Sequence, residues 1–234
     1  MEQKIMNEVN TLMQDIEELF PPGDNEGIVD PEIPLNKCAM NIISNVGTGY
    51  SFDKNQILRL KEAFDSNIMI LQEPALQLVN AFPWIRQIPV LGGFKSKFQE
   101  FLNNRDDIMS FIDDNIELKL KSYKQDDKPS DFIDQYLKEI NSRKLSNEPL
   151  DTFSMEQLKF TILDLYGAGT ETTLTTMRWF ILFLLHNNNA KIKCQGELDE
   201  LLSERESKKI SLKDKASLPY LSATIQETQR LGML

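Results

Sequence analysis

The sequence predicts an all-α, mainly helical fold, and three observations support this prediction. Apolar residues recur at three- and four-residue spacing over several long segments, as on the buried stripe of a helix. No segment keeps an alternation of apolar and polar residues, and no Asn-Gly or Asp-Gly pair indicates a hairpin turn. Residues 154–186 are mostly apolar and contain no proline, so a helix over them would span about 50 Å and cross a protein core.

The individual helices are predicted from their start and stop signals. Periodic apolar residues between breaks at proline and glycine predict helices over 5–19, 35–46, 53–72, 94–123, 131–144 and 154–186. Pro74, Pro83 and Pro89 divide the stretch that separates the third from the fourth of these helices. The last helix begins with Ser154 and Gln157, which can form a capping box and satisfy two backbone donors at the helix start.

Composition narrows the class of protein. A chain of 234 residues that is 41% apolar can bury a core, and we interpret 1–234 as a single partial domain. The formal net charge of −10 argues against nucleic acid as a partner, because a phosphate-binding face needs clustered lysine and arginine. Cys38 and Cys194 are too few for a disulfide framework and are expected to be reduced. The longest apolar run, 179–185, is far shorter than the roughly 20 residues of a membrane-spanning helix.

The middle of the long predicted helix is poorly suited to helix formation. Gly167 and Gly169 each cost about 1 kcal/mol relative to alanine. Residues four apart share a helix face, and here they form a strip that is small and polar at its centre: Asp164, Ala168, Thr172 and Thr176. The Thr172 hydroxyl can bond back to the carbonyl of residue 168, which loosens the helix and leaves room for water.

Two interpretations of this weakened turn follow from the residues alone. A flat macrocycle or another backbone could lie against 167–169, because no side chain holds it away. Glu171 would then be the acid nearest the opening, in apolar surroundings and placed to pass protons. Alternatively, the small residues only permit close helix packing, and Glu171 reaches solvent. The pattern leaves both interpretations open.

Two motifs carry a resemblance to a known family. Residues 168–173, Ala-Gly-Thr-Glu-Thr-Thr, resemble the oxygen-activation signature of the central helix of cytochrome P-450, Ala/Gly-Gly-x-Asp/Glu-Thr-Thr/Ser, at every position. Residues 227–230, Glu-Thr-Gln-Arg, are similar to the Glu-x-x-Arg motif that follows it in the family. Segments 38–43, 52–53 and 129–134 are similar to the microsomal animal branch. The resemblance, to a heme-thiolate monooxygenase, covers nearly the whole chain.

The resemblance assigns expected roles to individual residues. It implies a partial cytochrome P-450 fold with a long central helix and most of the sheet absent. Ala168, Gly169 and Thr172 would lie against the heme, an iron protoporphyrin IX, and the catalytic pair would be Thr172, which holds water, and Glu171, which relays protons. Asp164 and Ala168 would line the substrate pocket. Glu227 and Arg230 would form a structural pair, although without the resemblance they are interpreted as a surface salt bridge worth about 0 to 1 kcal/mol.

The resemblance also implies what the full-length parent does. It would insert one oxygen atom of O2 into a small apolar substrate, with electrons from NADPH delivered by NADPH-cytochrome reductase, at the cytosolic face of the endoplasmic reticulum membrane. The iron ligand of the family is the cysteine of Phe-x-x-Gly-x-x-x-Cys-x-Gly, and neither Cys38 nor Cys194 fits that motif. We therefore predict no metal ligand here and expect an interior fragment. The alternative is a heme-free, non-catalytic remnant or a helical binding module.

Overall fold

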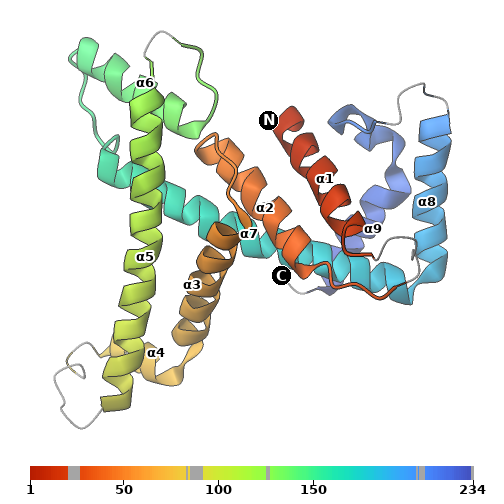
Figure 1. The fold of residues 1–234 in the computed structure, drawn as a ribbon, viewed down its shortest axis with the longest axis horizontal. Helices are drawn as coiled ribbons and strands as arrows, with labels where there is room; N and C mark the ends of the chain where they lie inside the picture. Colours follow the sequence, from red (N-terminus) through yellow and green to blue (C-terminus); the bar gives the residue numbers. More distant parts are fainter. Residues whose placement is uncertain are drawn as a thin grey trace. The chain divides into compact units, whose positions relative to one another are not determined.

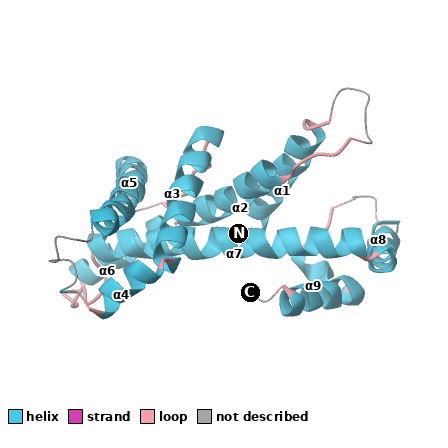
Figure 2. Cartoon of the chain, turned by 90° about the horizontal axis from the view of Figure 1, so that it is seen from below, coloured by secondary structure: helices cyan, strands magenta, loops and turns pink. Residues whose placement is uncertain are grey.

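The fold is built from helices. The computed structural model describes residues 1–20, 27–82, 84, 92–124, 127–203, 205 and 209–232. Within these ranges the regular structure is helical and includes no strand, as Figure 2 shows, so the all-α prediction is confirmed. Figure 1 labels the α-helices. In chain order the elements are α1 (Glu2–Glu17), α2 (Glu32–Gly47), α3 (Lys54–Gln72), α4 (Pro74–Ala81), α5 (Gly92–Ser122), α6 (Phe132–Leu145), α7 (Met155–His186), α8 (Asn188–Ser203), the 3-10 helix η2 (Leu212–Ser217) and α9 (Pro219–Leu231).

The chain packs as two compact units. The first unit comprises Met1–Ala39 and Ala168–Leu234, and the second comprises Met40–Gly167. Helices α2 and α7 each contribute a segment to both units. The boundary within α7 falls between Gly167 and Ala168, next to the motif at 168–173.

The second unit holds an apolar core formed by α3, α5, α6 and the first part of α7. Helix α3 packs along α5. Ile112, Ile133 and Leu158 are completely buried in this core. The ring of Phe52 meets that of Phe111 edge to face, with centroids 4.8 Å apart. Such burial stabilises a domain by roughly 1.5 to 3 kcal/mol for each large apolar side chain.

A buried polar cluster closes the same unit. The Lys119 ammonium lies 2.5 Å from Asp131 Oδ2 and 3.2 Å from Asp134 Oδ1. Asp131 is also the N-cap of α6, because its side chain accepts the backbone N–H of Asp134 at 3.0 Å. Gly49 has φ +80°, and a Cβ atom there would lie 2.6 Å from Asp131 Oδ2. Only glycine therefore fits beside this carboxylate.

The first unit is held together by polar contacts between its helices. Glu197 of α8 accepts the backbone N–H groups of Tyr220 and Leu221 at 2.9 and 2.8 Å. A carboxylate at this position satisfies donors at the start of α9 and interacts favourably with the helix dipole. Lys37 of α2 forms an ion pair with Asp15 of α1 at 2.8 Å. These contacts join α8 to α9 and α1 to α2 through side chains distant in sequence.

Helix boundaries differ from prediction mainly in α2 and α8. Helix α2 starts at Glu32, three residues before the predicted start, with Pro34 in its first turn. Proline is tolerated there because a backbone N–H in the first turn has no helical acceptor. Helix α4 was not among the predicted helices, and neither was α8. The first residues of α8 are asparagines, and among its residues Cys194 is the buried apolar one, so the apolar spacing is weak.

Both cysteines are free thiols, as expected. Cys38 lies buried in α2, and Cys194 lies buried in α8. The Cys194 thiol lies 3.6 Å from the Thr224 hydroxyl of α9.

None of the helices in the described ranges combines the length and the apolar character that a membrane crossing requires.

Candidate functional site

Helix α7 carries the predicted site. It extends over Met155–His186 as predicted, with Ser154 just before its first residue. The Ser154 hydroxyl oxygen accepts the backbone N–H of Gln157 at 3.0 Å, which is the hydroxyl half of the predicted capping box. At the far end, the His186 ring lies 2.9 Å from the Leu182 carbonyl.

Thr172 is bonded to its own helix, as the sequence predicted. Its hydroxyl donates to the Ala168 carbonyl at 2.6 Å, and the Thr176 hydroxyl donates in the same way to the Thr172 carbonyl at 2.9 Å. Two consecutive bonds of this kind occupy carbonyls that also serve the helix ladder, and such bonding bends or loosens a helix. In α7 these two bonds lie at 168–176, over the motif.

The strip defined by Asp164, Ala168, Thr172 and Thr176 lies on an open face of α7. Its first three residues are exposed, and Thr176 is half-buried. Between them the helix surface carries a methyl group and a hydroxyl that is folded back on the backbone. The side chains at the centre of the strip, Ala168 and Thr172, are therefore short and project little from the helix.

The space beside Gly167 is filled, contrary to the expectation that 167–169 is open throughout. A Cβ atom on Gly167 would lie 3.3 Å from Cε1 of Phe64, which belongs to α3. This glycine permits close approach of an aromatic ring. The next two residues of the helix, Ala168 and Gly169, are exposed and half-buried respectively.

The opposite side of this turn is buried and includes an unexpected polar group. Leu174 is fully buried, and Thr170 keeps 7% of its surface exposed. Within the described part of the chain, the Thr170 hydroxyl has no hydrogen-bond partner. A buried hydroxyl without a partner costs roughly 1 to 3 kcal/mol, and an ordered water is the usual remedy.

Glu171 lies in a polar setting instead of the expected apolar one. Its Oε1 accepts the Thr175 hydroxyl at 3.3 Å and lies 3.7 Å from Nη1 of Arg178. The other terminal nitrogen of Arg178, Nη2, donates to Oε1 of Glu32 at 3.0 Å. Sequence reasoning missed Arg178 and Glu32, because 146 residues separate them and neither belongs to a motif.

Glu227 and Arg230 form the predicted pair on α9. Arg230 Nε donates to one carboxylate oxygen at 2.7 Å and Nη2 to the other at 2.6 Å. The guanidinium of Arg230 lowers the pKa of Glu227, and the carboxylate raises the pKa of Arg230. Both side chains are more than half exposed, so solvent screens the pair.

Comparison with known proteins decides the family. The family model described as Cytochrome P450 matches residues 1–234. The chain belongs to the cytochrome P450 family. It is 32% identical over 238 residues to Cytochrome P450 2J3 of Rattus norvegicus, 29% over 234 residues to Cytochrome P450 2J2 of Homo sapiens, and 31% over 231 residues to Cytochrome P450 2C16 of Oryctolagus cuniculus. These alignments cover 98 to 99% of the chain and 44% of each relative, so the chain spans less than half the length of the relatives it matches.

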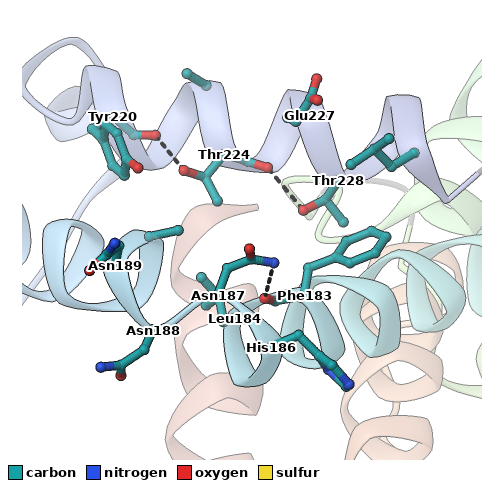
Figure 3. A pocket seen from close by; sticks show the side chains of 13 residues that line it. Phe183, Leu184, His186, Asn187, Asn188, Asn189, Tyr220, Thr224, Glu227 and Thr228 are labelled. Atoms are coloured by element: carbon teal, nitrogen blue, oxygen red, sulfur yellow. Dashed lines mark hydrogen bonds between the residues drawn. The ribbon is translucent and has the colours of Figure 1, made fainter.

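The cytochrome P450 chain also has a cavity away from the 168–173 motif. It measures about 730 Å³ and lies where α7 ends and α8 begins, facing α9 (Figure 3). Phe183, Tyr220, Thr224 and Thr228 are among its lining residues, and Glu227 lies at its margin on α9. The Thr224 and Thr228 hydroxyls bond to backbone carbonyls of α9, as Figure 3 shows. Because none of the lining residues belongs to 164–176, the two features are distinct.

Proposed function

We propose that this chain carries the oxygen-activating helix of a heme-dependent monooxygenase. The complete protein would insert one oxygen atom of O2 into a small apolar substrate, with electrons that originate from NADPH. Membership of the cytochrome P450 family supports this proposal. The observation that carries it is the bond of 2.6 Å from the Thr172 hydroxyl to the Ala168 carbonyl on an exposed strip, because a bond of this kind loosens a helix and here lies beside residues with small side chains.

Ala168, Gly169 and Thr172 fit a flat prosthetic group. Ala168 is exposed and carries only a methyl group, and Gly169 has no side chain. The Thr172 side chain is held against the backbone, so it does not project into the space beside these two residues. Ala168, Gly169 and Thr172 would hold one face of the heme. When bound, the heme supplies the redox and oxygen chemistry, and the protein supplies position and protons.

The roles of the polar residues follow from their places on α7. Thr172 would hold a water molecule at the strip, and Glu171 would relay protons to it. Adjacent helical residues are about 100° apart around the axis, so the two side chains face different directions and need water between them. Asp164 and Ala168 would contact the substrate from the same strip. Glu227 and Arg230 would stabilise the fold near the cysteine side of the heme.

The proposed partners follow from the family. NADPH-cytochrome reductase would deliver electrons to the complete protein. The complete protein would reside at the cytosolic face of the endoplasmic reticulum membrane. No nucleic acid is proposed as a partner, which agrees with the net charge of −10.

Two variants of Thr172 test the catalytic proposal in the heme-loaded parent protein. Thr172→Ala removes the hydroxyl, so we expect less product per NADPH and more peroxide. Thr172→Ser keeps the hydroxyl and serves as the matched control. Its ratio of product to NADPH should be close to that of the unsubstituted protein. Heme content is measured in each protein, so that loss of heme is not mistaken for uncoupling. An unchanged ratio of product to NADPH in Thr172→Ala would reject the role.

A heme-free helical binding module is the second candidate function. The burial of Cys38 and Cys194 supports it for these 234 residues alone, because neither thiol is open to an iron atom. Burial also raises the pKa of Cys38 to about 11, which disfavours the thiolate that binds metals. Titration of the 234-residue chain with hemin tests this candidate. Tight binding of one hemin per chain would exclude it.

A further inference from the structure

We propose that Arg178 is a positioning residue for Glu171, and that Glu32 controls how firmly Arg178 holds it. The proposal rests on the proposed role of Glu171 as a proton relay and extends it to two residues outside the motif. All three side chains belong to the first unit of the chain. Arg178 and Glu171 come from α7, and Glu32 comes from the first turn of α2.

The guanidinium of Arg178 is shared between two acids. Its Nη2 lies 3.0 Å from Glu32 Oε1, and its Nη1 lies 3.7 Å from Glu171 Oε1. An arginine can serve two carboxylates at once because its donors diverge in a fixed plane. The shorter contact is the stronger one, so Glu32 holds Arg178 and Glu171 receives the weaker share.

Helix geometry directs the Glu171 carboxylate away from Thr172. Residues 171, 175 and 178 lie on one face of α7, because they are separated by four and three positions. The Thr175 hydroxyl and Arg178 both draw the carboxylate toward the C-terminal end of the helix. The Thr172 hydroxyl is drawn the other way, toward Ala168. The acid must therefore leave Arg178 before it can approach the Thr172 side of the helix.

The position of Glu32 is itself fixed by the start of α2. The backbone N–H of Glu32 donates to the Asp30 carboxylate at 2.9 Å, which satisfies one backbone donor at the start of α2. Loss of the Glu32 charge would leave Arg178 to Glu171 alone and tighten that contact. Loss of Arg178 would release Glu171. The two substitutions therefore have opposite effects on the same carboxylate.

The experiment uses the 234-residue chain labelled with ¹³C at glutamate side-chain carboxyl carbons. The Glu171 signal is assigned by its loss in Glu171→Gln. We expect Arg178→Met and Glu32→Gln to move this signal in opposite directions from the unsubstituted chain. A half-exposed ion pair changes the equilibrium between the paired and the released carboxylate by about two- to five-fold, so both variants should shift the Glu171 signal only partially. Arg143→Met is the matched control, because Arg143 pairs with Glu139 at 2.7 Å in the second unit and should leave the Glu171 signal in place.

Two outcomes would overturn the inference: an unmoved Glu171 signal in Arg178→Met, or shifts of the same sign in both variants. If a variant fails to fold, salt serves as the second measurement on the unsubstituted chain. Screening at about 1 M salt shortens electrostatic reach to roughly 3 Å, so the Glu171 signal should move in the Arg178→Met direction. A signal insensitive to salt would count against the inference equally.

The result is separable from the fate of the proposed function. If Thr172→Ala leaves the ratio of product to NADPH unchanged in the heme-loaded parent, the proposed function fails whatever the signal does. If Thr172→Ala lowers the ratio of product to NADPH and the Glu171 signal is unchanged in Arg178→Met, only the positioning role fails.

Discussion

The ammonium of Lys119 lies 2.5 Å from Asp131 Oδ2, and the Asp131 side chain has 0% of its surface exposed. Breaking a buried ion pair on one side leaves the other charge without compensation, which costs about 3 to 5 kcal/mol. We expect Lys119→Met to lower the free energy of unfolding of the chain by about 3 kcal/mol in urea titrations.

The control for that prediction is an exposed pair of the same unit. Arg59 Nη2 lies 3.4 Å from Asp107, and both side chains are more than half exposed. Arg59→Met should change the free energy of unfolding by less than about 1 kcal/mol. Equal losses in the two variants would show that the Lys119 cluster is no more than a surface contact.

Gly49 and Gly196 form a second matched pair. Gly49→Ala places a Cβ atom 2.6 Å from Asp131 and forces alanine into φ +80°, so we expect a loss of about 1 to 3 kcal/mol. Gly196 lies inside α8, and apart from its chain neighbours and the adjacent helix backbone no described atom lies within 4 Å of the position that an alanine methyl group would take there. Gly196→Ala should therefore stabilise the chain by up to about 1 kcal/mol. Thermal midpoints compare the two directly, and the same sign for both would contradict the structure.

Asp214 predicts a dependence of stability on pH. Arg205 donates to both of its carboxylate oxygens, at 2.9 and 2.6 Å, and with the Ser211 N–H holds the pKa of Asp214 well below its usual range. The unfolded chain binds this proton near pH 4, before the folded chain does. The contribution of the Asp214 carboxylate to the free energy of unfolding is therefore present above about pH 4 and is lost as the pH falls below it.

Asp214→Asn removes that contribution, so the free energy of unfolding should fall less steeply between about pH 4 and pH 2. Arg205→Met should flatten the same slope, because it removes the first cause of the lowered pKa. A slope identical to that of the unsubstituted chain in both variants would contradict this assignment.

The cysteines predict protection from thiol reagents. Both thiols are buried, and burial, with help from Glu8 and Asp15, raises the pKa of Cys38 to about 11. The thiolate is the reactive form, so the folded chain should react slowly with a chromogenic disulfide at about pH 8. The unfolded chain should release two equivalents quickly, one for each cysteine. Rapid labelling of the folded chain at the unfolded rate would be inconsistent with the burial of Cys38.

Sequence patterns predicted those features that depend on local chemistry. Helix α7 could be bounded because Ser154 caps it and no proline interrupts it. The bond from Thr172 to Ala168 followed from a spacing of four residues. The pair of Glu227 and Arg230 followed from a spacing of three.

Features that depend on contacts between distant segments could not be read in this way. The approach of Phe64 to Gly167 depends on how α3 packs, which periodicity does not determine. The link from Arg178 to Glu32 joins two helices far apart in the chain. Sequence reasoning therefore expected apolar surroundings for Glu171, where the fold supplies a cation.

The hydroxyl hydrogen of Thr172 is already committed to the carbonyl of Ala168. The oxygen keeps its lone pairs and can still accept a hydrogen bond. A molecule that approaches from the exposed side of the helix must therefore be the hydrogen-bond donor. The motif then discriminates by polarity: water, an alcohol or a protonated oxygen can bind there, whereas a bare carbonyl finds no donor.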